Sequence, residues 1–395
     1  MKLTKEELNN RRSRFCKVMD ERNPDWDTAV IMGKANQYYF MGTMQDAVLL
    51  IRKGGAFSYH VRRSLERALD ESPFDDNIYP MLSYRDAAQA VGSDLGITYI
   101  ETEVVTYAIV QRFSKHFKMA QIKSLEGALM YVRSVKNPYE MYWVEKACAT
   151  QHSLLMEAVP GLLKEGISEA DFVGELQAKM MQYGYHGITR FYRFQTELVT
   201  GQVGFGISSL YPTSFDGPGG ALGTSAAAPV TGRRDVRLKK GDLVFVDCGF
   251  GMEGYHSDKT QVYMFGAKPS PEAISAHRAC IDIEQRAADM LRPGIAPSEI
   301  YNKIMGSLDE SFLENFMGFG QRSAKFLGHG VGMFVDEMPI IAAGFDEPLQ
   351  ENMTIALEPK KGIAGLGMVG VEDTYAVTPS GGRCLSGGGC DIIVV

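Results

Sequence analysis

Five side chains in the second half of the sequence are of types that bind metal ions, and each stands where burial is expected. They are Asp247, Asp258, His329, Glu358 and Glu372. Three of the acids lie beside short apolar runs, at residues 243–246, 355–357 and 374–377, which predict buried strands. Because an unpaired buried carboxylate costs several kcal/mol, the pattern indicates that cations accompany these side chains.

Asp247 and Asp258 are eleven residues apart, and their midpoint, Met252 and Glu253, lies in a segment with glycine at both ends. Glycines around the centre favour a hairpin turn at that point. We therefore expect Asp247 and Asp258 to be cross-strand neighbours on one face, with side chains within about 5.5 Å. Two ionised carboxylates at that distance must share a cation or a proton.

His329 is the imidazole candidate, because three glycines in 328–332 let the backbone bring its ring into a crowded site. Carboxylates suit manganese, magnesium or iron, and an added imidazole admits zinc or cobalt. Any one of the acids alone is better explained as a cap or a surface ion pair. Together, four carboxylates and a histidine predict a dinuclear site, with bridged metals about 3.5 to 4 Å apart and a shared hydroxide as nucleophile.

The elements that must position these side chains fall into two parts. Short apolar runs alternate with helical patterns over about the first 130 residues, which predicts a small α/β domain. Pro138 disfavours helix at the preceding residue and suits the start of a new one, so we expect domains at 1–136 and 137–395. The helical patterns of the first part cover residues 4–19, 61–71 and 105–117.

The second part combines about four helical patterns with the apolar strands, joined by hairpins, and so predicts an α+β domain. Its first two helices are expected over residues 139–163 and 168–183, and two more after Pro271 and Pro297. The glycine-rich stretch 201–223 fits neither a phosphate-binding nor a dinucleotide-binding fingerprint. We expect a loop there, and whether it lines a pocket is left open.

Composition excludes several classes of protein. The 395 residues carry 41 Lys and Arg against 48 Asp and Glu, a formal charge of −7, so we expect no nucleic-acid partner. The N-terminus begins with charged residues and no apolar run approaches the roughly 20 residues of a membrane span, so we expect neither an export leader nor a membrane partner. Six scattered cysteines without a C-x-x-C pair predict reduced thiols in the cytoplasm.

The segments around the five candidate ligands resemble, in order and spacing, the ligand motifs of the creatinase/aminopeptidase P/prolidase family. The resemblance covers roughly residues 138–380, and the N-terminal part resembles the smaller creatinase-type domain more loosely. The matching segments are Val246-Asp247-Cys248-Gly249, Gly254-Tyr255-His256-Ser257-Asp258, Gly328-His329-Gly330-Val331-Gly332, Leu357-Glu358-Pro359 and Val371-Glu372-Asp373-Thr374.

This resemblance implies a two-domain α+β protein: a small N-terminal α/β domain and a C-terminal catalytic domain of the "pita-bread" fold. It implies two divalent metal ions, manganese foremost, with zinc, cobalt or iron as alternatives. Asp247 would bind one metal, Asp258 and Glu372 would bridge, and His329 and Glu358 would bind the other. Glu358 would also handle the proton of the attacking water. Relatives are commonly homodimers, so a homodimer is expected.

The sequence departs from the family pattern at three places. Peptidases of the family usually have a second histidine seven residues after the ligand histidine, where this chain has Asp336. They also have a histidine in the loop before the first aspartate, but residues 217–240 contain none. An arginine two residues before the last glutamate is replaced by Gly370. These groups would stabilise the tetrahedral intermediate and hold the substrate, so the departures bear on substrate choice more than on metal binding.

Other side chains could replace the missing groups. His256 lies two residues before Asp258, hence on the same face of a strand, and is a candidate proton donor or shuttle. The alternative is a packed or surface histidine. His186 and Arg190 are candidates for the substrate pocket, with Arg190 binding a substrate carboxylate.

The leading hypothesis is a metal-dependent hydrolase, of the Xaa-Pro aminopeptidase or dipeptidase type, that cleaves the amide bond of a small peptide. The alternative is a family member acting on another small molecule, as a C–N hydrolase or a lyase. A third hypothesis, a binding protein without catalysis, is disfavoured because a scaffold has no need to bury four carboxylates.

Overall fold

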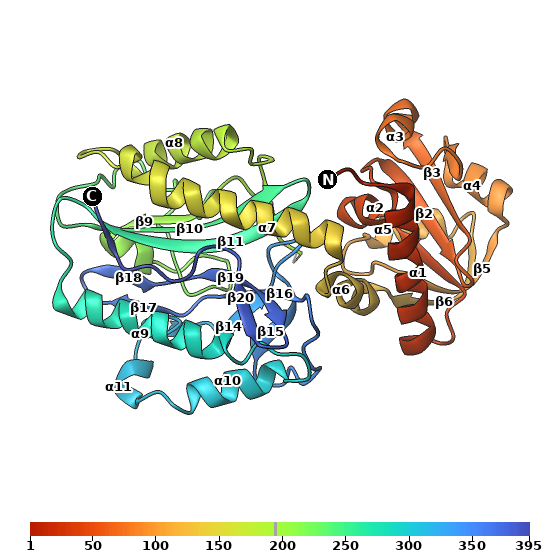
Figure 1. The fold of residues 1–395 in the computed structure, drawn as a ribbon. Coiled ribbons are helices and arrows are strands. Elements are labelled where there is room, and N and C mark those ends of the chain that lie inside the picture. The colour runs from red at the N-terminus through yellow and green to blue at the C-terminus, as the bar shows by residue number, and fades with distance from the viewer. Residues whose placement is uncertain (193–195) are drawn as a thin grey trace. The chain divides into compact units, whose positions relative to one another are not determined.

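The computed structural model describes residues 1–192 and 196–395 of the chain. The chain divides into two compact units, Met1–Arg133 and Ser134–Val395, each built from helices and sheets (Figure 1). Among the described residues, no helix combines the length and the apolar character that a bilayer crossing requires. All six cysteines are free thiols, as predicted.

The first unit contains a six-stranded mixed sheet in the order β4-β3-β2-β1-β5-β6. The predicted helix over 61–71 is wrong in its first part, because residues 61–63 belong to β3, where Val61 is buried against β2. The strands are β1 (Thr28–Ile31), β2 (Asp46–Arg52), β3 (Phe57–Arg63), β4 (Ile78–Pro80), β5 (Asp94–Ile100) and β6 (Lys118–Ser124). The helices are α1 (Lys5–Arg22), α2 (Lys34–Met41), α3 (Leu65–Glu71), α4 (Tyr84–Val91), α5 (Tyr107–Phe113) and α6 (Glu126–Ser134).

The second unit is built around two larger sheets, ordered β21-β11-β10-β9 and β15-β14-β16-β19-β20. The first has the strands β9 (Gly201–Phe205), β10 (Leu243–Met252), β11 (Tyr255–Met264) and β21 (Ile393–Val394). The second has the strands β14 (Phe326–Gly330), β15 (Glu337–Ala342), β16 (Thr354–Leu357), β19 (Asp373–Thr378) and β20 (Gly381–Cys384). Three two-stranded pairs complete it: β7 (Thr189–Arg190) with β8 (Glu197–Leu198), β12 (Gly318–Phe319) with β13 (Arg322–Ser323), and β17 (Lys360–Ile363) with β18 (Gly367–Gly370).

Helices cover both sheets from outside (Figure 1). Helices α7 (Pro138–Ser153) and α8 (Glu169–Gln182) share an apolar core with β9, β10 and β11, whereas α9 (Pro271–Ala288) and α10 (Pro297–Met305) pack against the five-stranded sheet. A short helix, α11 (Glu310–Leu313), follows α10. The predicted helix over 139–163 continues past α7 as a π turn and a 3₁₀ turn, because Pro160 cannot donate an α-helical hydrogen bond.

The β10–β11 hairpin corrects one predicted pairing. Its two-residue turn is Glu253-Gly254, both with positive φ, so Asp247 pairs with Thr260, and Asp258 with Gly249. The predicted turn, Met252-Glu253, lies one residue earlier and would place two non-glycine residues in the left-handed region. The observed turn places Gly254 at the second position, where glycine adopts this conformation without strain. Asp247 and Asp258 are therefore diagonal neighbours, still on the same face because the shift is two residues.

Replacing Gly254 by alanine should lower the free energy of unfolding by about 1 kcal/mol, because its φ of 84° suits glycine and strains an L-residue. Gly174→Ala is the matched control: it lies exposed inside α8 with open space around it, so it should be neutral or slightly stabilising. Urea unfolding followed by circular dichroism measures both. Equal effects of the two substitutions would contradict the turn assignment.

Candidate active site

The five predicted side chains converge on one place in the second unit, where its two sheets meet. Asp247 lies on β10 and Asp258 on β11, whereas His329 lies on β14 of the other sheet. Glu358 directly follows β16, and Glu372 lies between β18 and β19. The apolar runs that suggested buried strands therefore do carry their acids to a common site.

His329 faces three carboxylates. Its Nε2 lies 3.4 Å from Glu358 Oε1, 3.9 Å from Glu372 Oε1 and 4.0 Å from Asp258 Oδ2. Ligand atoms of Asp258, His329 and Glu372 all lie within 4.8 Å of one another. One imidazole nitrogen and carboxylate oxygens at this spacing form a donor set that suits a divalent cation.

The second nitrogen of His329 supports the same conclusion. Nδ1 lies 3.2 Å from the carbonyl oxygen of Gly330, to which it can donate a proton. That hydrogen bond would leave the Nε2 lone pair facing the carboxylates. Histidines that bind metals usually hold their other ring nitrogen in this way, so the residues present fit a metal ion.

Lys360, which the sequence analysis missed, lies inside the carboxylate cluster. Its Nζ is 3.0 Å from Asp247 Oδ2, 2.9 Å from Glu358 Oε2 and 2.7 Å from Glu372 Oε2. The Lys360 side chain has 0% of its surface exposed. A signal existed in the sequence: Lys360 is two residues after Glu358, a spacing that places both on one side of an extended chain.

Gly370 explains how Lys360 fits. The two residues are cross-strand partners in the β17–β18 pair, and a Cβ at Gly370 would lie 2.6 Å from Lys360 Cα and 3.1 Å from its Cγ. His277 on α9 holds this turn of chain, since its Nδ1 accepts a hydrogen bond of 3.1 Å from Gly370 N. The atom nearest to a Cβ at Gly370 would be the backbone oxygen of Pro359, at 2.4 Å, and the φ of Gly370 is 129°, so a glycine at this position lets the strand of Lys360 approach closely.

The electrostatics follow from burial and from these contacts. Burial, reinforced by Asp247, raises the pKa of Asp258 to about 7. Burial would lower the pKa of His329, but the contact with Glu358 outweighs it and raises the pKa to about 9. Burial would raise the pKa of Glu358, but Lys360 and His329 together lower it. Without a metal ion, the cluster therefore holds protons as well as the lysine.

Two threonines fix the acids and were not predicted. Thr260 Oγ1 donates to Glu372 Oε2 at 2.9 Å, and a backbone bridge joins the same two residues across the sheets. Thr374 Oγ1 accepts from Asp258 N at 3.1 Å and donates to Asp258 O at 2.9 Å. Both threonines lie within two residues of an acid, a spacing that alone carries too little information to single them out.

Both ring nitrogens of His256 and of His186 contact main-chain atoms. Nε2 of His256 accepts from Arg190 N at 3.2 Å, and its Nδ1 lies 3.1 Å from Gly332 O. Nε2 of His186 lies 2.8 Å from Ile188 O, and its Nδ1 accepts from Gly254 N. The two rings meet edge to face, with centroids 5.0 Å apart. Roles in proton transfer or substrate binding stay predictions for both.

Arg190 and Asp336 have partners outside the carboxylate cluster. The guanidinium of Arg190 pairs with Glu197 at 3.1 Å. Asp336, where the family has its second histidine, accepts from Tyr192 N at 2.5 Å.

The prediction of a loop over the glycine-rich stretch 201–223 is wrong in its first half, where β9 pairs with β10 and a 3₁₀ turn, Gly206–Leu210, follows. In the segment after this turn, a Cβ on Gly219 would lie 3.4 Å from Asp247 Oδ2, so the segment passes close to the acids.

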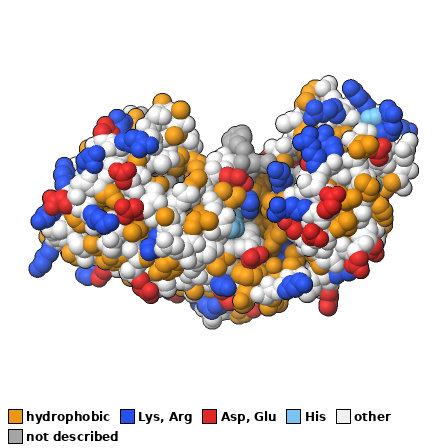
Figure 2. Space-filling model, turned by 90° about the horizontal axis from the view of Figure 1, so that it is seen from above, with side chains coloured by type: hydrophobic (Ala, Val, Ile, Leu, Met, Phe, Trp, Pro, Cys, Tyr) orange, Lys and Arg blue, Asp and Glu red, His pale blue; other side chains and the backbone are white. Residues whose placement is uncertain are grey.

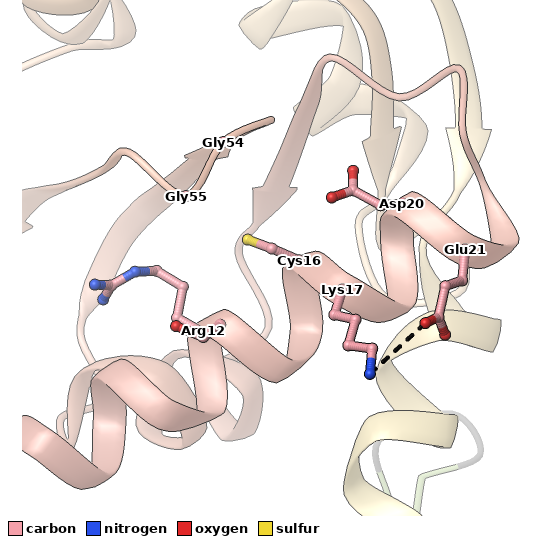
Figure 3. A pocket seen from close by; sticks show the side chains of 8 residues that line it. Arg12, Cys16, Lys17, Asp20, Glu21, Gly54 and Gly55 are labelled. Carbon is pink, nitrogen blue, oxygen red and sulfur yellow. Dashed lines mark ion pairs between the residues drawn. The ribbon is translucent and has the colours of Figure 1, made fainter.

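A separate hollow of about 600 Å³ lies in the first unit, between α1 and the turn after β2 (Figure 3). Arg12, Cys16 and Asp20 on α1 face Gly54 and Gly55 there, and the hollow shares no residue with the carboxylate cluster. On the face seen in Figure 2, basic and acidic side chains are interspersed over the surface.

Comparisons with known proteins agree with this geometry. Residues 144–379 match the Metallopeptidase family M24, and residues 11–135 match the Creatinase/Prolidase N-terminal domain. The chain therefore belongs to metallopeptidase family M24. The predicted family, its two-domain α+β pita-bread fold and the class of metal-dependent peptidase are confirmed, and the non-peptidase alternative is not favoured.

Individual relatives cover nearly the whole chain. An Xaa-Pro dipeptidase of Pyrococcus furiosus is 24% identical over 388 residues, which is 96% of this chain and 98% of that protein. An uncharacterised peptidase of Staphylococcus aureus is 25% identical over 95% of this chain and 99% of its own length. Among solved structures, a prolidase from Pyrococcus horikoshii OT3 has a TM-score of 0.78 at 22% identity, covering 97% of this chain and 100% of that one. An Xaa-Pro dipeptidase from Bacillus anthracis has a TM-score of 0.79 at 20% identity, covering 98% and 100%.

His186 gives a pH-dependent prediction. Burial, with Arg190 nearby, lowers its pKa from the usual 6.5 to about 4, so the unfolded chain takes up the proton first as the pH falls. The free energy of unfolding should therefore decrease from pH 6.5 downward, and His186→Gln should remove up to about 2 kcal/mol of the decrease by pH 5. Urea unfolding at pH 7.5 and pH 5 measures it, and an unchanged pH dependence in the variant would show that His186 is not held neutral.

Proposed function

We propose that this chain hydrolyses the amide bond of small peptides of the Xaa-Pro type, as a dipeptidase or an aminopeptidase. The observation that carries the proposal is the cluster of four carboxylates and one imidazole on two facing sheets, in a chain of the M24 family. The relatives named as Xaa-Pro dipeptidase and prolidase support the substrate class.

Asp258, His329 and Glu372 would hold a divalent cation, which we propose to be manganese, with zinc, cobalt or iron as alternatives. Such an ion supplies Lewis acidity, polarising the scissile carbonyl and lowering the pKa of water. The resemblance predicts two ions, with Asp247 and Glu358 completing the ligand set, and that number stays a prediction.

The chain's own residues supply the rest of the proposed mechanism. Glu358 Oε1 lies beside His329 in the cluster, where a carboxylate can take the proton of the attacking water and return it to the leaving nitrogen. Arg190 is the proposed partner of a substrate carboxylate, in exchange for its exposed pair with Glu197. His256 is the proposed proton donor or shuttle and His186 a proposed residue of the substrate pocket; main-chain contacts to Gly332 O and Gly254 N orient their rings.

A panel of Xaa-Pro dipeptides and longer peptides, with matched Xaa-Ala peptides, tests the substrate class on manganese-loaded protein. We expect cleavage at the bond before proline. Asp258→Asn and His329→Ala should each lower kcat/KM by at least about 100-fold, because each removes a ligand of the cation.

Asp282→Asn is the control, since Asp282 lies exposed on α9 and pairs only at the surface with Arg286. Its kcat/KM should equal that of the unmodified chain. Preferential cleavage of the Xaa-Ala peptides would contradict the substrate class. Full activity of Asp258→Asn would contradict the site.

We further propose that the protein acts as a cytoplasmic homodimer: its free thiols support the compartment, and the family resemblance implies the dimer. Sedimentation equilibrium should give twice the mass of the 43.6 kDa chain. A single-chain mass at micromolar concentration would contradict the dimer.

A further inference from the structure

The two glutamates of the cluster divide it into two halves. Glu358 directs Oε2 to Lys360 Nζ at 2.9 Å and Oε1 to His329 Nε2 at 3.4 Å. Glu372 does the same, with Oε2 at 2.7 Å from Nζ and Oε1 at 3.9 Å from His329. Each glutamate therefore has one oxygen toward the ammonium and one toward the imidazole. Carboxylates that bridge two cations have this arrangement.

The geometry points to a centre in which the ammonium group of Lys360 takes the place of one of two metal ions, so that the chain binds a single divalent cation between Asp258, His329 and Glu372. This inference rests on the proposed function insofar as the cluster holds a cation at all. The inference goes beyond the proposed function because it states how many metal ions bind and which carboxylates contact the ammonium or the metal.

Space argues for this assignment. Metal–oxygen bonds of about 2.0 to 2.2 Å would require an ion among the oxygens of Asp247, Glu358 and Glu372, where Nζ already lies at 2.7 to 3.0 Å. The Lys360 side chain is fully enclosed, with the Phe245 ring centroid 5.8 Å from Nζ. A second ion would have to displace a buried side chain.

Charge balance is compatible with this assignment. An ammonium and one divalent cation supply three positive charges to four carboxylates and leave one negative charge, whereas Lys360 with two divalent cations would supply five and leave one positive charge. The hydrogen bond from Thr260 to Glu372 stabilises the remaining negative charge. The lysine and a second metal would both need the oxygens of Asp247, Glu358 and Glu372.

Counting bound manganese tests the inference. The full chain, Lys360→Ala and Lys361→Ala are stripped with a chelator, reloaded with Mn²⁺, separated from excess metal and analysed by mass spectrometry for manganese per chain. We expect one ion in the unmodified chain, two in Lys360→Ala and one in Lys361→Ala. Lys361 is the matched control because its Nζ bonds the carbonyl oxygens of Phe312 and Glu314 instead of the acids.

The outcomes separate this inference from the proposed function. Two ions in the unmodified chain, or one in both it and Lys360→Ala, would overturn the inference and leave a metal-dependent peptidase intact. No ion in either would overturn the proposed function as well. The electron paramagnetic resonance spectrum gives a second count, since isolated Mn²⁺ should appear in the unmodified chain and a coupled pair in Lys360→Ala.

Thermal unfolding keeps the inference testable if Lys360→Ala folds poorly. Without its ammonium, the metal-free variant should melt more than about 5 °C below the unmodified chain, and Mn²⁺ should restore the difference. Lys361→Ala should show no such rescue. A metal-free Lys360→Ala as stable as the unmodified chain would show that Lys360 does not neutralise the acids.

Discussion

The second unit depends on one electrostatic constraint: four carboxylates that lie together out of water must have positive charge among them. Lys360 meets Asp247, Glu358 and Glu372 within 3.0 Å and has no exposed surface. His329 faces the opposite oxygens of the same two glutamates. Burial, reinforced by Asp247, also raises the pKa of Asp258 to about 7.

The two large sheets of the second unit bring the acids and their positively charged partners to one place. One hairpin brings two aspartates to one face, the other sheet brings the imidazole and the glutamates, and the Thr260–Glu372 bridge fixes the distance between them. The outer helices bury the opposite faces in apolar cores, so the polar residues can meet only at the seam. Packing on both sides therefore sets the position of the acids and holds them together against their mutual electrostatic repulsion.

The convergence of the five candidate ligands was predictable from the sequence, because an acid beside a buried apolar strand must lie near a cation or another polar partner. The predicted register of the hairpin was wrong by two residues, because Asp247 pairs with Thr260 instead of Asp258. Gly251 and Gly254 allow a turn at either of two positions, and only the structure shows that Glu253 and Gly254 have the positive φ of the turn. Lys360 was missed for a different reason. In the chain it is one of two adjacent lysines, which usually indicate a solvated strand, and only the fold shows that one is enclosed while its neighbour binds carbonyl oxygens outside the site.

Lys360 and Gly370 are coupled by packing. They are partners across the β17–β18 pair, and the space that a side chain at 370 would need is filled by Lys360 Cα and Cγ. The close approach of the two strands places the Lys360 ammonium, on the strand that follows Glu358, among the acids. Near this cluster, the segment that contains Gly219 approaches Asp247, and the Arg190 guanidinium pairs with Glu197. With Lys360 and one divalent cation the four carboxylates would keep one negative charge, so a substrate carboxylate would need a cationic partner of its own, the role proposed for Arg190.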